Sequence, residues 1–413
     1  MMHAFCYSLL ALALAAILFE EHLHLSKAKA TLFLGTLAWI TLWIFPEGFG
    51  GREHVRIRFE EELLGISSLW LFLVATMTFV AYLNKQGFIE ALIYRWLPRQ
   101  ISLRKLMLFV GLFAFAFSSL ADNITATLVC LSLILTLPVD NTPKLRCAVL
   151  AVFAINSGGV ALITGDVTTL MIFLAGKLPV LDIMLLSLPA LGGVLILFAL
   201  LQHGMDQSIA LTPRAIVLRG RDWAVAGIFL LTLICTISGS LLFSLPPLLV
   251  FLCGLSVMFI AGWWLGIGDE GDWLDYVRVI EFETLFFFLG VLLLVGLALE
   301  LGALDIIPTL YAEYPTAWAN YLMGLMSALI DNVPMTAALL KSGVHMDHNG
   351  WLGLTYAIGV GGSLLVIGSA AGIVAMSKMR ELSFSAYLRY SPLILIAYSG
   401  GYGLACLVGM LLI

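Results

Sequence analysis

The sequence predicts an all-α polytopic membrane protein built from an inverted repeat, and two observations lead to this fold class. Hydrophobic residues make up 61% of the 413 residues and charged residues only 11%, with a mean hydropathy of +1.04. Such a chain has too few polar residues to cover a water-soluble globule. A polar motif also occurs twice inside apolar surroundings, which is typical of membrane transporters made of two repeats. We expect about ten spanning helices, two re-entrant hairpins and two broken helices.

The repeated motif combines a hydroxyl, a carboxylate and an amide. Its first copy reads Ser-Ser-Leu-Ala-Asp-Asn-Ile-Thr-Ala-Thr over residues 118–127. The second copy reads Ser-Ala-Leu-Ile-Asp-Asn-Val-Pro-Met-Thr over residues 327–336, which is 209 residues later. A glycine-rich segment with the same internal spacing follows each copy. These segments are Gly158-Gly159 with Gly165-Asp166, and Gly361-Gly362 with Gly368-Ser369.

Apolar segments before, between and after the motifs approach the length that crosses a membrane, about 20 residues for about 30 Å of hydrocarbon. Residues 46–62 carry charges of both signs and are expected to form a solvated connector. The expected spans are residues 5–19, 30–44, 63–83, 180–202, 223–243, 248–265, 284–299 and 392–413.

Residues 107–138 and 319–343 are predicted to form the two re-entrant hairpins. The apolar run from Met107 to Leu120 offers only about 21 Å of helix before Asp122 and Asn123 interrupt it, which is too short to cross. A hairpin with this polar pair at its tip explains the interruption. Ser118 is expected to share a helical face with Asp122, four residues later.

Residues 148–176 and 351–377 are predicted to be the broken helices. They are long enough to cross but have polar, glycine-rich centres. Glycines there are expected to let the backbone unwind and free carbonyl groups for a cation. The alternative is close packing of helices through small residues. The glycines concerned are Gly158, Gly159, Gly165, Gly361, Gly362 and Gly368.

The distribution of lysine and arginine supports a specific topology. If the N-terminus lies outside and both hairpins return to the side they enter from, only five of the 21 basic residues lie outside, as the positive-inside rule requires. Five crossings per half then give the halves opposite orientations. The expected units are residues 1–203, a cytoplasmic linker at 204–221, and residues 222–413. The outside residues are Arg52, Arg56, Arg58, Lys177 and Lys341.

Asp122, Asp166 and Asp331 are the candidate functional carboxylates. An ionisable group at bilayer depth costs at least about 2.5 kcal/mol unless it is paired or binds a ligand. The same central segments contain no lysine or arginine, so a bound cation or a proton is the expected partner. A hydrogen-bonded tether between helices is the structural alternative. Neutral oxygens suited to a hard cation come from Asn123, Asn156, Asn332, Thr168 and Thr169, and Ser118 and Ser327 precede the motif aspartates.

With these residues identified, the sequence resembles the NhaD-type sodium/proton antiporters of the ion transporter superfamily over most of its length. The resemblance rests on the first motif, on residues 165–169 and on residues 361–372, and it includes Glu20-Glu21-His22 and Glu281-Phe282-Glu283. Val366 departs from the family, in which a serine is common. The resemblance carries over these functional positions: Ser118, Asp122, Asn123, Asn156, Asp166, Thr168, Thr169, Ser327, Asn332 and Ser363.

The resemblance implies a secondary antiporter of a bacterial inner membrane that exports sodium or lithium in exchange for protons and serves pH homeostasis. It implies no enzymatic activity and no cofactor. Relatives suggest a homodimer in the lipid bilayer, for which the sequence indicates no interface. The net charge of -5 offers no basic surface for nucleic acid.

The mechanistic hypothesis is that sodium and protons compete for Asp122 and Asp166, because a carboxylate that holds a proton cannot also hold sodium. Asp331 and Asn332 would complete this site or serve the symmetric half. One competing hypothesis is an anion carrier of the same superfamily for dicarboxylate or arsenite. Another is an intramembrane aspartyl protease that uses Asp122 and Asp166 as a catalytic pair.

Overall fold

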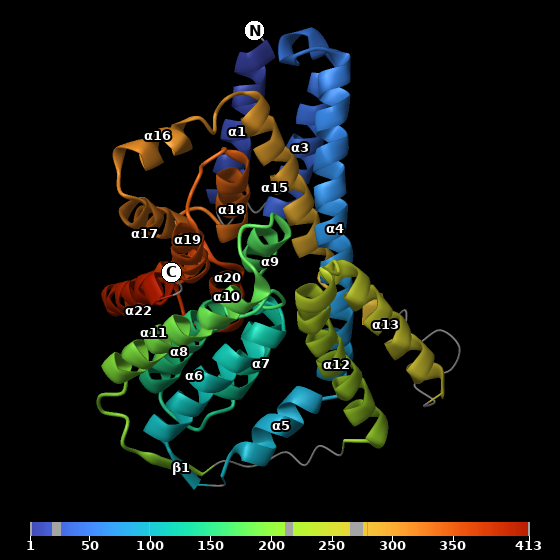
Figure 1. Cartoon of the computed structure of the whole chain (residues 1–413). Helices are drawn as coiled ribbons and strands as arrows, with labels where there is room; N and C mark the ends of the chain where they lie inside the picture. The colour runs from blue at the N-terminus through green and yellow to red at the C-terminus, as the bar shows by residue number, and fades with distance from the viewer. Residues whose placement is uncertain are drawn as a thin grey trace.

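The chain folds into an almost entirely helical structure (Figure 1). The computed structural model describes residues 2–18, 26–98, 100–210, 218–264, 276–278 and 280–411. The Glu20-Glu21-His22 motif and residues 211–217 of the expected linker lie outside the described residues. Six candidate spans in the described ranges are long and apolar enough to cross a membrane, and the protein is therefore a multi-pass membrane protein. They are α4, α6, α10 with α11, α12, α15 and α22.

The first half of the chain contains the helices before the linker. They are α1 (Met2–Leu18), α3 (Lys27–Ile44), α4 (Arg52–Lys85), α5 (Phe88–Trp96), α6 (Leu103–Leu120), α7 (Asn123–Leu135), α8 (Asn141–Gly159), α9 (Val167–Leu174), α10 (Val180–Leu185) and α11 (Ser187–Leu201). Two short strands, β1 (Gln100–Ser102) and β2 (Ser208–Ala210), pair antiparallel with Ile101 opposite Ile209. This ribbon is a small departure from the expected all-α fold.

The second half begins with α12. Its helices are α12 (Gly220–Phe243), α13 (Pro247–Trp264), α15 (Phe282–Glu300), α16 (Ile306–Glu313), α17 (Thr316–Ser327), α18 (Asn332–Lys341), α19 (His348–Gly361), α20 (Ala370–Lys378), α21 (Phe384–Leu388) and α22 (Ser391–Leu411). Two single 3-10 turns lie between α19 and α20. The interruptions from α8 to α9 and from α19 to α20 both lie inside the predicted broken helices.

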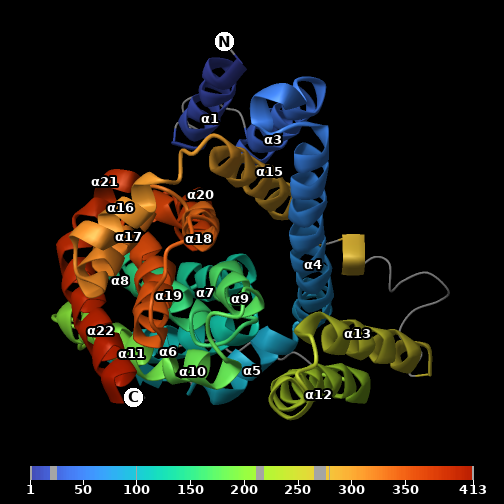
Figure 2. The ribbon, with the colours of Figure 1, turned by 45° about the horizontal axis from the view of Figure 1, so that its top comes forward.

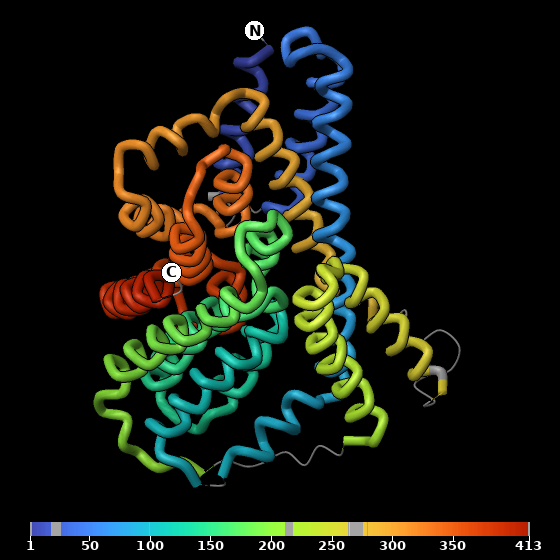
Figure 3. The backbone as a smooth tube through the Cα atoms, viewed as in Figure 1, coloured from blue at the N-terminus to red at the C-terminus, as the bar shows by residue number. Residues whose placement is uncertain are grey.

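The expected connector at residues 46–62 is wrong in its second part, which is helical, although most of its charged residues are exposed as expected. After a 3-10 turn at Pro46–Phe49, α4 begins at Arg52 and has 34 residues. Figure 3 shows α4 as one long continuous helix. Its charged residues pair along the helix, with Arg56 bonded to Glu53 at 2.5 Å and to Glu60 at 2.7 Å. Pairs spaced three and four residues apart stabilise a helix, so this charged segment continues α4.

The predicted length of the first hairpin arm is also wrong. Because Ser102 caps α6 by accepting the Lys105 N–H at 3.4 Å, the helix begins at Leu103 and has 18 residues, or about 27 Å. Length alone therefore does not exclude that α6 crosses a membrane. Ser118 and Asp122 do not share a helical face, because α6 ends at Leu120 and Asp122 precedes α7.

The helices form two groups, which Figure 2 shows in a view tilted from that of Figure 1. The α4 group consists of α1, α3, α4, α12, α13 and α15, and the α8–α19 group consists of α6 to α11 and α17 to α22. Inside the α8–α19 group the halves interlock, since α7 packs against α20 and α18 packs against α9. The two groups meet where α18 lies against α15 and where α10 lies against α12.

Glycines let the broken helices approach the preceding helices closely. A Cβ atom on Gly158 would lie 2.2 Å from the Phe115 carbonyl oxygen, and one on Gly361 would lie 2.2 Å from the Gly324 carbonyl oxygen. Phe115 and Gly324 are equivalent positions of the two motif-bearing segments, so both halves use the same contact. Neither glycine has a positive φ. Close packing, rather than backbone unwinding, therefore explains this glycine pair.

Gly158→Ala should destabilise the folded protein by about 1–3 kcal/mol, because the added methyl group would overlap backbone atoms. Gly227 of α12 has open space around its Cβ position, so Gly227→Ala is the matched control and should be neutral or slightly stabilising. Thermal unfolding of the two purified variants in detergent measures the difference. Equal midpoints would contradict the packing described above.

Candidate functional site

The three candidate aspartates line one cavity of about 190 Å³. Asp122 and Asn123 come from the start of α7, Asp166 from the start of α9, and Asp331 and Asn332 from the start of α18. Asp166 and Asp331 are only 9% and 8% exposed. The fold therefore brings both copies of the Asp-Asn motif to the same cavity, although they are far apart in the sequence.

Asp122 is held by the first turn of α7. One carboxylate oxygen accepts the Ile124 N–H at 3.1 Å and the Thr125 N–H at 2.9 Å, and the other accepts the Thr125 hydroxyl at 2.8 Å. An aspartate at this position satisfies helix N–H groups that have no partner in the helix. The positive end of the helix dipole also stabilises its charge.

Three further helices begin at the site with an equivalent cap. Asp331 accepts the Val333 N–H at 3.4 Å. Asp166 accepts the Thr168 N–H at 3.5 Å and the Thr168 hydroxyl at 3.0 Å. Ser369 occupies the position in the second half that corresponds to Asp166, and its hydroxyl accepts the Gly372 N–H at 3.2 Å. Four helices that follow the motifs and the glycine-rich segments, α7, α9, α18 and α20, thus begin around the cavity, and three of them carry a carboxylate at the N-terminus.

Two asparagines connect the halves across the site. The Asn332 amide donates to Asp166 Oδ2 at 3.1 Å. The Asn156 amide donates to both the Ser363 and Ser369 hydroxyls at 2.9 Å. The Asn156 carbonyl oxygen is buried and has no hydrogen-bond partner among the described residues. It is a neutral acceptor one layer behind the cavity wall.

Six of the predicted site residues are buried behind the cavity wall and do not line it. The motif serines make equivalent contacts, since Ser118 donates to the Ile155 carbonyl at 2.8 Å and Ser327 to the Ile358 carbonyl at 3.0 Å. These bonds join each motif to the following broken helix. The six residues are Ser118, Asn156, Thr168, Thr169, Ser327 and Ser363.

A lysine at the cavity corrects the expectation that no basic residue neutralises the aspartates. Lys27 Nζ lies 3.4 Å from Asp331 Oδ2 and 4.6 Å from the centre of the Phe287 ring. Sequence reasoning missed this ion pair because 304 residues separate its partners. A signal was present in the sequence, since Lys27 begins α3 shortly before its apolar run.

Acidic residues at the start of α15 also line the cavity and were not among the predicted site residues. Glu281 and Glu283 are exposed, so they mark the open side of the cavity. The Ser26 hydroxyl donates to Glu283, and the Thr284 hydroxyl donates to Glu281 at 3.4 Å. Across the described residues, no three histidine, cysteine or acidic side chains are arranged to hold a metal ion. A cation at this site would therefore also need neutral oxygens.

Comparison with known proteins identifies one matching family model. The model of the citrate transporter family, CitMHS, matches residues 8–361. This match covers both Asp-Asn motifs and the first broken helix, and it extends to the end of α19.

Several relatives match along nearly the whole chain. The Na(+)/H(+) antiporter NhaD of Vibrio cholerae is 30% identical, over 94% of this chain and 88% of the relative. The Na(+)/H(+) antiporter NhaD of Alkalimonas amylolytica is 31% identical, over 95% and 88%. Sodium/proton antiporter 1 of Arabidopsis thaliana is 31% identical, over 91% of this chain and 67% of the relative.

Proposed function

We propose that the chain exchanges sodium or lithium for protons across a membrane. It matches the CitMHS family model over most of its length and belongs with the NhaD sodium/proton antiporters. The observation that carries the proposal is the cavity at which Asp122, Asp166 and Asp331 meet. Its relatives are named as transporters, and the protein is a secondary transporter rather than an enzyme.

The caps at the helix N-termini favour a cation as the transported ion. A carrier of citrate or another anion would use free helix N-termini to bind its substrate. Here Asp122, Asp166 and Asp331 already cap three of the helices that begin at the site, α7, α9 and α18. The positive ends of these helices stabilise the protein's own carboxylates, which in turn present negative oxygens to the cavity. This arrangement argues against the anion carrier.

Exchange follows from competition at Asp122 and Asp166. Each carboxylate can be neutralised by a proton or contribute to a sodium site, but it cannot do both. A site without either ligand would keep its uncompensated charge while it crosses the hydrophobic barrier, and this movement is costly. Only the loaded states therefore move readily. Acidification should raise the half-saturating sodium concentration because protons then occupy the carboxylates.

We place the ion closer to the first half of the site. That half contributes Asp122 and Asp166, whereas the second half contributes Asp331 and the neutral Ser369. A hard cation gains most from negatively charged oxygens, and amide or carbonyl oxygens complete its coordination. Asn123 and Asn332 line the same cavity and are the nearest neutral candidates.

The proposed topology is an inverted repeat of about ten crossings with two re-entrant hairpins, in a bacterial inner membrane. One contact pattern supports the first hairpin. The Arg104 N–H donates to the Met205 carbonyl at 2.9 Å, and the Arg146 side chain donates to the His203 carbonyl at 2.5 Å. The chain therefore enters α6 and leaves α7 at the same end of the molecule. We also propose a homodimer, on the basis of the family resemblance alone.

Asp122→Asn should reduce sodium-driven proton movement at least about tenfold, because the site loses one of the charges for which sodium and protons compete. Asparagine can still accept the N–H groups of α7, so folding should be preserved. Everted vesicles with an imposed proton gradient measure the exchange with sodium, lithium and potassium. Asp140→Asn, at an exposed helix start, is the matched control. Full exchange by Asp122→Asn would remove Asp122 from the mechanism.

Asp166→Asn should raise the half-saturating sodium concentration about tenfold or more, since a charged ligand becomes neutral. Ser369→Ala should have a smaller effect, because its hydroxyl lies behind the cavity and caps α20. Ser363→Ala should resemble Ser369→Ala, since each removes one acceptor of the Asn156 amide. Titrations at one pH rank the variants. If Ser369→Ala were the most damaging, the ion would belong to the second half.

Arg104→Cys and Arg146→Cys, each as the single cysteine of the chain, should react with an impermeant thiol reagent from the same side of the membrane. Arg56→Cys should react from the opposite side, because α4 begins at the end of the molecule opposite β1 (Figure 1). Labelling in intact cells and in everted vesicles tests the three positions. Reaction of the first two variants from opposite sides would refute the re-entrant hairpin.

A further inference from the structure

We propose that the Lys27 ammonium is a tethered cation of the transport site, which neutralises Asp331 when no sodium is bound and is displaced when sodium binds. The inference rests on the proposed function, since it adds a residue to the same site. Lys27 belongs to the α4 group and Asp331 to the α8–α19 group, and both line the cavity. The contact therefore joins the two groups of helices at the site.

The geometry of the ion pair suits a contact that can be broken. Asp331 Oδ1 accepts the Val333 N–H, and Oδ2 faces Lys27 Nζ at 3.4 Å. A strong ammonium–carboxylate hydrogen bond measures about 2.7–2.9 Å, so this bond is long. The Phe287 ring lies 4.6 Å from Nζ and stabilises the ammonium by a cation–π contact. The ring can retain this contact when Asp331 turns to another cation.

Helix chemistry does not explain a lysine at this position. Lys27 is the first residue of α3, where the helix dipole disfavours a positive charge. The Ser26 side chain makes no cap hydrogen bond to α3, and its hydroxyl donates to Glu283. The Lys27 side chain is only 17% exposed. The unfavourable placement is offset by the carboxylate-rich cavity that the ammonium faces.

Sodium can replace the Lys27 ammonium beside Asp331 without any proton transfer at Lys27, because one positive charge takes the place of another. With all three aspartates ionised, the ammonium offsets one of their negative charges. Sodium held mainly by Asp122 and Asp166 that also contacts Asp331 Oδ2 in the same cavity would take over this role and repel the ammonium, since two cations cannot share one carboxylate oxygen closely. Glu281 and Glu283 on the open side of the cavity offer alternative negative partners for the released ammonium. Sodium binding would thus loosen a contact between the two groups of helices.

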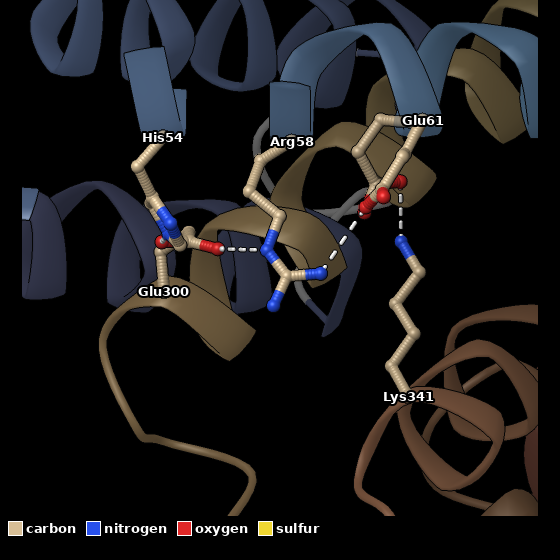
Figure 4. A network of polar contacts seen from close by, with 6 residues as sticks. His54, Arg58, Glu61, Glu300 and Lys341 are labelled. Carbon is tan, nitrogen blue, oxygen red and sulfur yellow. Dashed lines mark hydrogen bonds and ion pairs between the residues drawn. The ribbon is translucent and has the colours of Figure 1, made fainter. Parts of the chain in front are cut away.

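A second ion pair at the other end of α18 provides an internal control. Lys341, the last residue of α18, contacts Glu62 of α4. Figure 4 shows Lys341 in the same network as Arg58 and Glu300. The lysine lies beside an ion pair in which Arg58 Nε is 3.3 Å from Glu300. Lys341 also joins α18 to the α4 group, but it does not line the aspartate cavity. Loss of Lys341 therefore tests mechanical anchoring of α18 without changing the charge of the site.

The test measures sodium binding by isothermal titration calorimetry on the purified, full-length protein. Lys27→Gln should bind sodium about fivefold more tightly than the wild type, because the competing cation is gone. The effect of Lys27→Gln should disappear in an Asp331→Asn background, which a double-mutant cycle shows. Lys29→Gln, which removes an exposed lysine from the same first turn, and Lys341→Gln should leave sodium affinity unchanged.

Unchanged or weaker sodium binding by folded Lys27→Gln would overturn the role of Lys27, and so would equally tighter binding by Lys341→Gln. Lys27→Met, which keeps an unbranched side chain beside Phe287, replaces Lys27→Gln if that variant does not fold. The proposed function is judged separately on the wild type. Absence of sodium binding and exchange in the wild type would overturn both proposals, whereas normal exchange with unaltered affinity in Lys27→Gln would overturn only this one.

Discussion

An ionised carboxylate placed at membrane depth must be compensated, and much of this structure serves that requirement. A continuous helix has no free N–H groups in its middle, so it cannot support an internal aspartate with its backbone. The chain breaks its helices at the site, and the new N-termini supply those groups. Asp122, Asp166 and Asp331 each cap such a terminus. Each break leaves backbone N–H groups without a partner in the helix, and the aspartate carboxylates accept hydrogen bonds from these groups.

Convergence of these termini depends on close contact between backbones. Gly158 and Gly361 allow each broken helix to touch the helix that precedes its Asp-Asn motif. The serine bonds from Ser118 and Ser327 then fix the depth of each motif relative to that helix. Because α7 packs against α20 and α18 against α9, the site consists of contacts between the halves, and neither half forms it alone.

The two halves of the chain form the site with the same arrangement of helices, but they differ in the charge of the residues that cap those helices. Asp166 and Ser369 cap equivalent helices, so the backbone arrangement survives with either residue. The carboxylate nevertheless adds a negative charge to the first half that the second half lacks. Lys27 increases this difference, because it offsets Asp331 of the second half. A symmetric scaffold thus carries an asymmetric distribution of charge around the cavity.

The sequence alone determined the membrane class, the duplication and the residues that mark the helix breaks, because composition and short motifs are local properties. It also identified Asp122, Asp166 and Asp331 as a set, since apolar surroundings make a carboxylate conspicuous. Only the tertiary structure decided that α4 continues through the charged residues after Arg52, that the glycine pairs serve close packing, and that Lys27 meets Asp331. These features depend on which distant segments come into contact, and packing of the whole chain sets those contacts.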